Sequence, residues 1–312
     1  MNHMTAKISC FARAYHYKHN QIHVFKDSAA KLLLGSDYEQ IELNMINGIG
    51  FFLPGFTGTK EEGLRLIVDK QLSPSVLGRS AFCEKMLEKE KALGCKQYII
   101  FASGYDTYSL RNADKSLSVF EMDLPELLTD KIERIKRTGI KTDSVFVSCN
   151  LAEMTWKEKL LQQGYMSTQK SFGSLLGICY YLSKEEFRLL LQGVSELMMD
   201  GSLICFDYPS DEESNESKTN QMLAMEAGEQ MKAHYSDCEL EELLSSCGFE
   251  ITVHLNHDEM TRQYFSDYNN CNSEYAMKAP IGVSYVLAER KTISDEELSG
   301  QKARQRDYTK VV

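Results

Sequence analysis

The amino-acid sequence predicts an α/β protein whose core is a doubly wound, mostly parallel sheet. From Gln97 to Asp207, short β-rich runs alternate with longer helical patterns, which is the signature of a parallel sheet covered by helices. Most of these runs end in small, polar or acidic residues. The chain has 312 residues, enough for one large α/β domain with additions or for two small domains.

Five β-rich runs define the expected strands of this region: "QYIIFAS", "LSVFEMD", "DSVFVSCN", "SLLGICYYL" and "SLICFDY". Two helical patterns lie among them, "LPELLTDKIERIKRTG" and "SKEEFRLLLQGVSELMMDG". Pro125 stands near the start of the first pattern, and Gly139 and Gly201 stand where the two patterns end, as expected at helix boundaries.

The segments on either side of this region have a different character. Before residue 97, "GIGFFLPGFTGTKEEG" is a glycine-rich connector, and "EEGLRLIVDKQL" and "SAFCEKMLEKEKALG" predict amphipathic helices. After residue 208, "PSDEESNESKTNQ" is polar and acidic, "DCELEELLSSCGFEITVHL" predicts a helix and a strand, and "GVSYVLAERK" predicts the last strand. We therefore expect an N-terminal helical lid at 1–94, a ligand-binding core at 95–292 with a substrate insertion at 209–270, and a poorly ordered tail at 293–312.

Composition argues against several classes of protein. Lys and Arg number 35 against 45 Asp and Glu, and the net charge of −10 disfavours binding to nucleic acid or to an anionic membrane. The nine cysteines include no CxxC pair, and several lie in apolar runs, as expected of reduced core thiols. The N-terminus lacks the apolar core of a signal peptide, and no run of ~18 apolar residues occurs. We expect a soluble, cytoplasmic protein.

The run "FASGYDT" gives the first expected strand the features of a ligand-binding turn. In an open α/β sheet, ligands bind beyond the carboxyl ends of the strands, where small residues admit the ligand and Gly104 can take a positive φ. The next strand ends in "FEMDLP", so Asp123 follows Gly104 by 19 residues, close to the spacing at which an acid binds ribose hydroxyls. The alternatives are a tight turn without a ligand and, for Asp123, a helix N-cap ahead of Leu124 and Pro125. Asp123 can fill both roles.

These residues also resemble a known family. "YIIFASGYDTYSLR" and "VFEMDLPELLTDKIERI" are similar to the first nucleotide-binding motifs of the leucine carboxyl methyltransferase family, class I S-adenosylmethionine-dependent O-methyltransferases. "FARAYHYKHNQIHVFKDSAAKLLLG" resembles its opening segment, and "SLLGICYYLSKEEFRLLL" resembles its fourth-strand motif. The resemblance covers residues 11–208, and weakly continues to residue 291. It implies a Rossmann-like, seven-stranded sheet with an antiparallel last strand, an N-terminal helical lid and S-adenosylmethionine as the cofactor.

The resemblance also implies roles for individual residues. Arg79 falls where the family places an arginine that pairs with the carboxylate of the cofactor's methionine, and Arg13 lies in the other basic segment that does this. A planar guanidinium suits this task because it binds a carboxylate through two parallel hydrogen bonds, although each arginine could instead be a solvated surface charge. Gly104 and Asp106 would line the methionine side, Asp123 would hold the ribose, and Leu151 would lie against the adenine. The expected cofactor-binding residues are Arg13, Arg79, Ala102, Ser103, Gly104, Asp106, Asp123, Leu124, Asn150 and Leu151.

Three residues depart from the family pattern. Ala102 stands where the family usually has the first glycine of its turn, which is a mild change. Asn150 replaces an aspartate that reads the adenine amino group, and its side-chain carbonyl keeps an acceptor there. Leu176 occupies the usual place of a glutamate, so it removes a negative charge near the sulfonium or amine of the cofactor. This third change predicts weakened affinity or altered chemistry.

The expected reaction requires alignment of a nucleophile with a methyl group and needs no metal. A carboxylate acceptor needs no base, whereas a hydroxyl requires a group that takes its proton. The candidates for this base are His234, His254 and His257, each with a structural role as the alternative. A second group of histidines shares one face of an expected helix, but it belongs to the expected lid, and we predict no metal site there: His16, His19 and His23.

The acceptor pocket is expected to be built from the additions to the sheet. Tyr15, Tyr208 and Arg262 are the residues proposed for its wall, with packing or surface roles as the alternative. Acceptors in the family include protein C-terminal carboxylates, a modified-tRNA carboxylate and hydroxyls of small metabolites, and the acidic balance disfavours tRNA. Because no basic or long apolar docking surface is visible, we predict O-methylation of a carboxylate or hydroxyl of a small molecule, with a protein C-terminal carboxylate as the alternative acceptor.

Two other classes of function stay open at this point. One is a regulatory protein that binds S-adenosylmethionine without turnover, which Leu176 and Asn150 make worth considering. The other is an NAD-dependent oxidoreductase, because a glycine turn followed by an acid after the second strand also serves NAD. The turn lacks the spaced triple glycine of that class, and "FEMDLPE" matches the methyltransferase form. The sequence does not indicate the oligomeric state.

Overall fold

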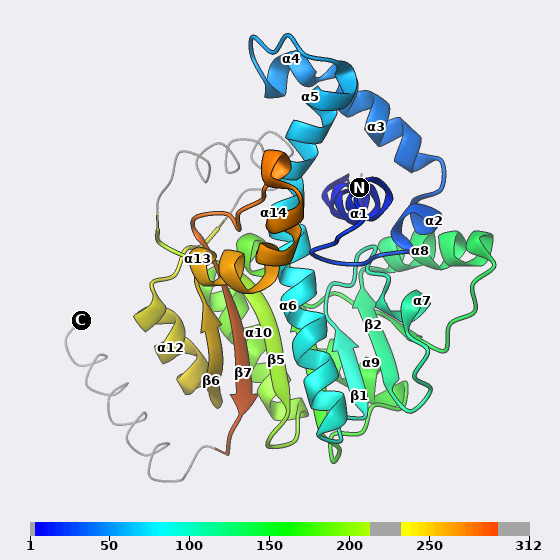
Figure 1. Ribbon diagram of the computed structural model, residues 1–312. Helices are drawn as coiled ribbons and strands as arrows, with labels where there is room; N and C mark the ends of the chain where they lie inside the picture. The colour runs from blue at the N-terminus through cyan, green and yellow to red at the C-terminus, as the bar shows by residue number, and fades with distance from the viewer. Residues whose placement is uncertain (1–3, 213–231, 293–312) are drawn as a thin grey trace.

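The computed structural model describes residues 4–212 and 232–292. Within these residues, seven strands form one sheet in the order β3-β2-β1-β4-β5-β7-β6 (Figure 1). The first five strands pair in parallel, and β7 runs antiparallel to both of its neighbours. The predicted Rossmann-like sheet with an antiparallel last strand is thereby confirmed. The strands are β1 (Gln97–Ile100), β2 (Ser118–Asp123), β3 (Val145–Ser148), β4 (Ser171–Leu175), β5 (Leu203–Pro209), β6 (Phe249–Leu255) and β7 (Val283–Arg290).

Local sequence explains where several helices begin and end. Four helices, α5, α10, α12 and α13, begin with a capping box, in which the N-cap side chain and a glutamate three residues later satisfy each other's backbone N–H groups. Helix α8 begins at Pro125 and ends before Gly139, whose φ of 73° closes the last turn. The α-helices are α1 (Met4–His19), α2 (Ala30–Leu34), α3 (Asp37–Asn47), α4 (Ile49–Phe52), α5 (Lys60–Ile67), α6 (Ser73–Ala92), α7 (Tyr108–Arg111), α8 (Pro125–Thr138), α9 (Trp156–Gln162), α10 (Lys184–Leu197), α12 (Asp237–Ser246), α13 (His257–Met260) and α14 (Ser266–Cys271).

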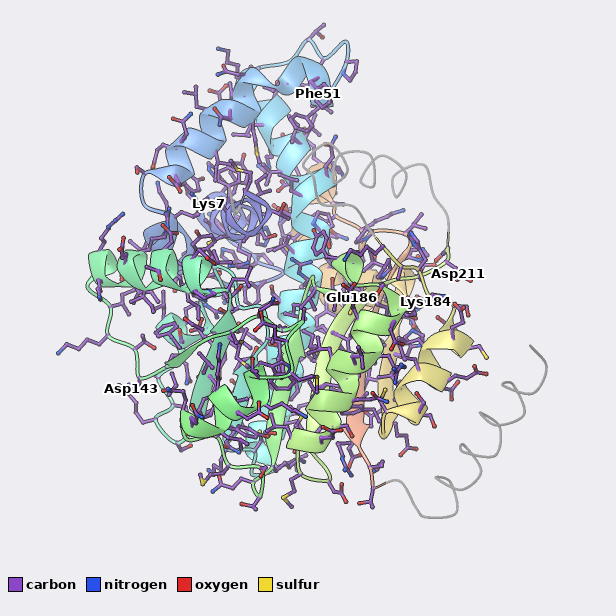
Figure 2. The ribbon with its side chains drawn as sticks, turned by 180° about the vertical axis from the view of Figure 1, so that it is seen from behind. Lys7, Phe51, Asp143, Lys184, Glu186 and Asp211 are labelled. Atoms are coloured by element: carbon purple, nitrogen blue, oxygen red, sulfur yellow. The ribbon has the colours of Figure 1, made fainter. Side chains whose placement is uncertain are left out.

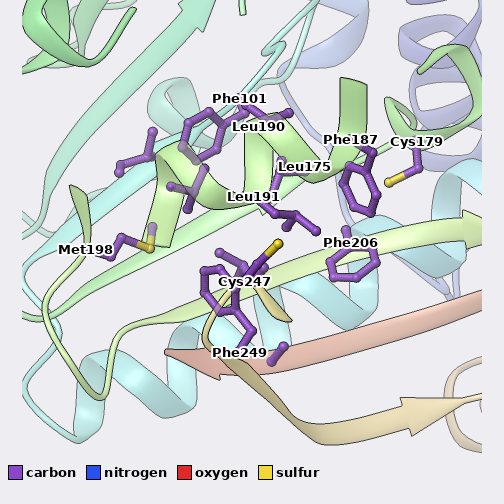
Figure 3. Close-up of a cluster of buried hydrophobic side chains, with 14 of the residues drawn as sticks. Phe101, Leu175, Cys179, Phe187, Leu190, Leu191, Met198, Phe206, Cys247 and Phe249 are labelled. Atoms are coloured by element: carbon purple, nitrogen blue, oxygen red, sulfur yellow. The ribbon is translucent and has the colours of Figure 1, made fainter. Parts of the chain in front are cut away.

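Helices cover both faces of the sheet, and alternate residues of β1 enter two different cores. Ile99 belongs to the core that α9, α10 and α12 cover, whereas Tyr98 and Ile100 belong to the core that α6 covers. Figure 3 shows the first core, where the rings of Phe187 from α10 and Phe206 from β5 meet edge to face with centroids 5.5 Å apart. Because both faces are buried, the strands read as apolar runs without a polar face.

The N-terminal helices α1 to α5 form a helical cap beyond the carboxyl ends of the parallel strands (Figure 1). Helix α6 runs from this cap down one face of the sheet. A third core fills the cap and continues onto α8, with Phe11, Tyr38 and Leu64 from the cap and Leu127 from α8 among its members. At the outer end of the cap, Phe51 is exposed and points away from the sheet (Figure 2). The cap therefore covers the edge of the sheet at which a parallel fold binds its ligands.

Two expected elements differ from the structure. The run "SLLGICYYL" is a strand only as far as Leu175, because Gly177 takes a φ of 67° and Cys179–Tyr181 then form a 3-10 turn, η2. Helix α6 begins at Ser73, seven residues before the predicted start, with Pro74 in its first turn and a π-helical segment, η1 (Val68–Leu72), ahead of it. The expected tail, residues 293–312, and residues 213–231 of the expected substrate insertion lie outside the described residues.

A helix that spans a membrane needs about 20 mostly apolar residues. The helices of residues 4–212 and 232–292 include no segment of this kind.

Candidate functional site

A pocket of about 1090 Å³ lies at the carboxyl ends of the parallel strands, beneath the helical cap. Its floor is the turn after β1 together with the ends of β2, β4 and β5, and its walls come from α1, α6 and the segment that enters β7. The pocket therefore occupies the position that the fold class predicts for a ligand. It brings together residues that are up to 278 positions apart in the chain, from Thr5 to Val283.

The turn after β1 has a backbone that most side chains avoid. Gly104 has a φ of 47°, and Ala102 has a φ of 49°, which makes Ala102 the one non-glycine residue with a positive φ among the described residues. This left-handed conformation costs an L-residue about 1–2 kcal/mol because Cβ approaches the following carbonyl. The structure thus shows why a glycine is expected at position 102, and that alanine adopts the same backbone at the cost of strain.

Asp123 is the last residue of β2, and its side chain stabilises this turn by hydrogen bonding. Its Oδ2 accepts a hydrogen bond of 2.7 Å from the backbone N–H of Gly104, and its Oδ1 accepts one of 2.8 Å from that of Leu124. The N-cap residue of α8 is Leu124. Asp123 therefore does not have the alternative role of an N-cap. Asp123 lines the pocket and is 8% exposed, and it places a negative charge beside the glycine turn.

A buried ion pair, which the sequence analysis did not identify, lies behind the same turn. Lys131 of α8 and Glu121 of β2 pair through side chains that are both fully buried. Lys131 Nζ also donates to Ser103 Oγ at 3.4 Å, and Ser144 Oγ donates to Glu121 Oε1 at 3.2 Å. The ion pair therefore supports the turn from the side that faces away from the pocket. Lys131 lies on the buried face of α8 with Leu127, Leu128 and Ile135, and a charge on this apolar face was the signal that could have indicated the pair.

Arg13 enters the pocket from α1 and is held by neighbours. Its Nε donates to Asp27 Oδ2 at 2.8 Å, and its Nη2 donates to the carbonyl of Tyr105 at 2.7 Å. Burial raises the pKa of Asp27, but Arg13 and Arg111 lower it by more, so the carboxyl stays ionised. Arg13 thus ties the cap to the turn after β1 while its guanidinium lines the pocket.

Arg79 enters the same pocket from α6. Its Nη1 lies 3.4 Å from Asp207 Oδ2, and its guanidinium lies over Gly177, where a Cβ would approach Nη1 to 2.7 Å. Burial lowers the pKa of Arg79, but Asp207, Tyr180 and Tyr181 together raise it by more, so Arg79 keeps its positive charge. Two guanidinium groups therefore line the pocket, and such groups bind carboxylates well.

Eight of the ten residues expected at the cofactor line this pocket: Arg13, Arg79, Ala102, Ser103, Gly104, Asp106, Asp123 and Leu124. Asn150 and Leu151, the residues expected at the adenine, lie outside its walls. Asn150 instead accepts from the backbone of Ala152 and donates to Glu153, while Leu151 packs against the core that α10 covers. Leu176, which replaces the expected glutamate, does line the pocket and places an apolar side chain there.

The three residues expected in the acceptor wall lie elsewhere. Tyr15 is buried in the core of the cap, where its ring stacks on His19 at 4.2 Å. Tyr208 is fully buried in β5, and its hydroxyl donates to Asp237 Oδ1 at 2.9 Å, on the side of the sheet that α12 covers. Arg262 is exposed in the π-helical segment η3 (Thr261–Phe265). Tyr208 faces away from α6, because alternate residues of a strand face opposite sides of the sheet.

The histidines separate into different environments. His234 lines the pocket, with Nδ1 3.4 Å from the carbonyl of Ser210. His254 Nε2 lies 2.9 Å from the hydroxyl of Tyr208, and His257 Nδ1 lies 3.2 Å from Glu212 Oε2. Neither His254 nor His257 lines the pocket. In the cap, His16 is fully buried and accepts from the backbone N–H of Val24. The described residues contain no cluster of three or more His, Cys, Asp or Glu side chains that could hold a metal.

The family model for leucine carboxyl methyltransferase matches residues 6–195 of this chain. The chain belongs to the leucine carboxyl methyltransferase family. A relative from Bacillus subtilis, YktD, named as a candidate S-adenosyl-L-methionine-dependent methyltransferase, is 34% identical over 279 residues, which are 85% of this chain and 91% of the relative. The predicted family and enzyme class are therefore confirmed, and the NAD-dependent oxidoreductase is set aside.

Solved structures support the fold of this methyltransferase. A DUF574 family protein of Streptomyces avermitilis has a TM-score of 0.56 and 12% identity, covering 91% of this chain and 97% of its own. A candidate methyltransferase of Thermobifida fusca has a TM-score of 0.53 and 13% identity, covering 92% and 94%. At these identities the two structures bear on the fold alone.

Proposed function

We propose that this methyltransferase transfers a methyl group from S-adenosylmethionine to a carboxylate or hydroxyl oxygen of a small molecule. One observation carries the proposal: a single pocket is lined by eight of the ten residues expected at the cofactor and also by a set of apolar side chains. S-adenosylmethionine is the methyl donor of this family, and when bound it supplies an electrophilic methyl group on a sulfonium.

The pocket residues fit this cofactor in size and in charge. Ligand pockets for drug-sized molecules measure roughly 300–1,000 Å³, and this pocket measures about 1090 Å³. The guanidinium groups of Arg13 and Arg79 suit the carboxylate of a methionine, and the carboxylate of Asp123 suits the hydroxyls of a ribose. Gly104, beside Asp123, presents backbone without a side chain, so a nucleoside can approach closely.

The remaining wall of the pocket is mainly apolar, which supports a small acceptor with an apolar body. These side chains come from η1, α6, the end of β5 and the segment that enters β7: Leu72, Val76, Pro209, Pro280, Ile281 and Val283. Polar and charged side chains also line this part of the pocket: Gln71, Ser75, Ser210, Asp211, Glu212, Lys232 and His234. A few polar groups in an apolar pocket orient a small ligand, whereas a nucleic acid would need a basic surface.

The residues of the wall can also assist the reaction. Enclosure beneath the cap keeps nucleophile and methyl group aligned and limits water, which is the main requirement of an in-line displacement. A carboxylate acceptor needs nothing further. For a hydroxyl acceptor, His234 is the proposed base: a bond in which Nδ1–H donates to the carbonyl of Ser210 makes Nε2 the basic nitrogen of the ring.

The experiment is an acceptor screen with S-adenosylmethionine labelled in its methyl group. Carboxylic acids, phenols, alcohols and a peptide that ends in a leucine carboxylate are incubated with the enzyme, and labelled product and S-adenosylhomocysteine are measured. We expect label in a small carboxylate or hydroxyl. Label in the peptide alone would contradict the small-molecule acceptor, and cofactor binding without transfer to any acceptor would favour the regulatory alternative.

His234→Gln separates the two kinds of nucleophile. It should slow methylation of a hydroxyl about 10²-fold or more, because general bases contribute 10²–10⁴-fold, and should leave methylation of a carboxylate nearly unchanged. If the variant slows methylation of both kinds of acceptor by the same factor, His234 does not have this role.

We also propose a cytoplasmic location without a nucleic-acid or membrane partner. The nine cysteines are free thiols, seven of them buried, which is the usual state of cysteines in a reducing compartment. The net charge of −10 supports the same conclusion for nucleic acid.

A further inference from the structure

Asp207, near the end of β5, is a buried carboxylate that no part of the proposed chemistry uses. Its side chain is fully buried, directly behind the pocket wall. Its Oδ1 accepts a hydrogen bond of 2.7 Å from the backbone N–H of Gly177, and its Oδ2 accepts one of 2.9 Å from the hydroxyl of Tyr180. Burying a charge is costly, and such groups are kept where they have partners. The third partner of Asp207 is Arg79, at 3.4 Å from Oδ2.

These contacts hold the guanidinium of Arg79 between the carboxylate of Asp207 and the backbone of Gly177. Among the described residues, Asp207 is the carboxylate with which Arg79 pairs. On its other side the guanidinium lies over Gly177, where a Cβ would stand 2.7 Å from Nη1 and 2.9 Å from Nη2. Asp207 also holds the N–H of Gly177 itself, so one carboxylate positions both the arginine and the glycine that makes room for it.

Tyr180 completes the arrangement. Burial raises the pKa of Tyr180 well above its ordinary value, and Asp207 raises it further, so the hydroxyl keeps its proton and acts as a donor to Asp207. Tyr180 and Arg79 both line the pocket, whereas Asp207 lies behind them. The carboxylate therefore acts on a ligand only through these two side chains and Gly177.

We propose that Asp207 is a positioning residue that holds the guanidinium of Arg79 toward the carboxylate of the cofactor's methionine. The inference rests on the proposed cofactor, and it concerns binding of the amino-acid end alone. An arginine that is already ordered loses less conformational entropy when it binds a carboxylate, because its rotamer freedom is lost on folding. Removing the charge at position 207 should weaken ligands that carry this carboxylate and spare ligands that lack it.

The test compares two ligands by isothermal titration calorimetry: S-adenosylhomocysteine, which has the amino-acid carboxylate, and 5′-methylthioadenosine, which lacks it. Asp207→Asn keeps the shape of the side chain and an acceptor for Gly177, but it removes the charge. We expect the Kd of S-adenosylhomocysteine to rise about tenfold, because the arginine would then lose its rotamer freedom on binding, and the Kd of 5′-methylthioadenosine to change less than about twofold.

Asp69→Asn is the matched control. Asp69 is also fully buried and pairs with an arginine, Arg65, at 3.2 Å, but it does not line the pocket. This variant should bind both ligands like the wild type. If Asp207→Asn does not fold, Gly177→Ala is the second variant, because its Cβ would push the guanidinium of Arg79 away and should produce the same selective loss.

Each outcome decides the inference. A selective loss of S-adenosylhomocysteine supports it. An equal loss of both ligands would assign Asp207 a general structural role and overturn it, as would unchanged affinities. Failure of the wild type to bind S-adenosylhomocysteine would instead refute the cofactor and, with it, the proposed function, so the two failures are distinguishable.

Discussion

Replacing Lys131 by Met should destabilise the protein strongly, because it leaves Glu121 buried without its countercharge. Both side chains of this pair are fully buried, and methionine has nearly the length of lysine, so loss of charge dominates over loss of packing. Ser144 Oγ stays within 3.2 Å of Glu121 but is a single neutral donor. We therefore expect the free energy of unfolding to fall by about 3–5 kcal/mol at pH 7, the usual result of breaking a buried pair.

A second calculation gives the same range and adds a pH dependence. A buried carboxylate without a partner can escape its charge by taking up a proton, which for an ordinary glutamate with a pKa of about 4.3 costs about 3.7 kcal/mol at pH 7 and about 1 kcal/mol at pH 5. Lys131→Met should therefore lose much less stability, relative to the wild type, at pH 5 than at pH 7.

The assay is urea unfolding of the variant and the wild type at both pH values. Glu121→Gln combined with Lys131→Met removes both charges and should recover most of the loss. Lys115→Met is the surface control: Lys115 and Asp143 form an ion pair with side chains 69% and 75% exposed, and such pairs contribute less than about 1 kcal/mol. A Lys131→Met variant within 1 kcal/mol of the wild type at pH 7, or one with the same deficit at pH 5, would refute the reasoning.

Three further predictions follow from single side chains. Ala102→Gly should raise the free energy of unfolding by about 0.5–1 kcal/mol, since relief of the left-handed strain exceeds the added entropy of the unfolded chain; a lower urea midpoint would contradict this. His16 has a pKa lowered by burial to about 3, so the unfolded chain binds its proton first, and stability should fall as pH drops from about 6.5 toward 3, by about 2 kcal/mol at pH 5. His16→Gln should show a correspondingly smaller loss between pH 7.5 and pH 5, and an identical loss in both proteins would disprove it. Asp123→Asn should weaken S-adenosylhomocysteine about tenfold by calorimetry, and unchanged affinity would count against the ribose contact.

The predictable part of the site is local in sequence. The turn "FASGYDT" and the acid that ends the next strand lie on adjacent parallel strands, so pairing of β1 with β2 places them side by side, and Asp123 does bond Gly104. Both faces of β1 are buried, which explains why a continuous apolar run indicates a strand of a parallel sheet. In both cases the spacing along the chain and the geometry in space are related by one strand pairing.

The unpredicted part depends on contacts between distant segments. Asp207 and Arg79 are 128 residues apart, and neither strand nor helix periodicity indicates that they meet. Tyr208, the neighbour of Asp207, was expected in the pocket and instead faces the other core, because one step along a strand reverses the side. The position of Lys131 on the apolar face of α8 indicates a buried charge, but only the packing of α8 on β2 shows that Glu121 is its partner.

The amino-acid sequence by itself determined the class of fold, the order of its seven strands along the chain, the glycine turn and its acid, and the family. These properties follow from side-chain periodicity, turn chemistry and motif spacing, which act over a few residues or one strand pairing. The tertiary structure decided which side chains line the pocket, that Arg13 and Arg79 are both among them, and that Asp207 pairs with Arg79. Such choices depend on how the cap packs on the sheet, and that packing is set by the whole set of buried contacts.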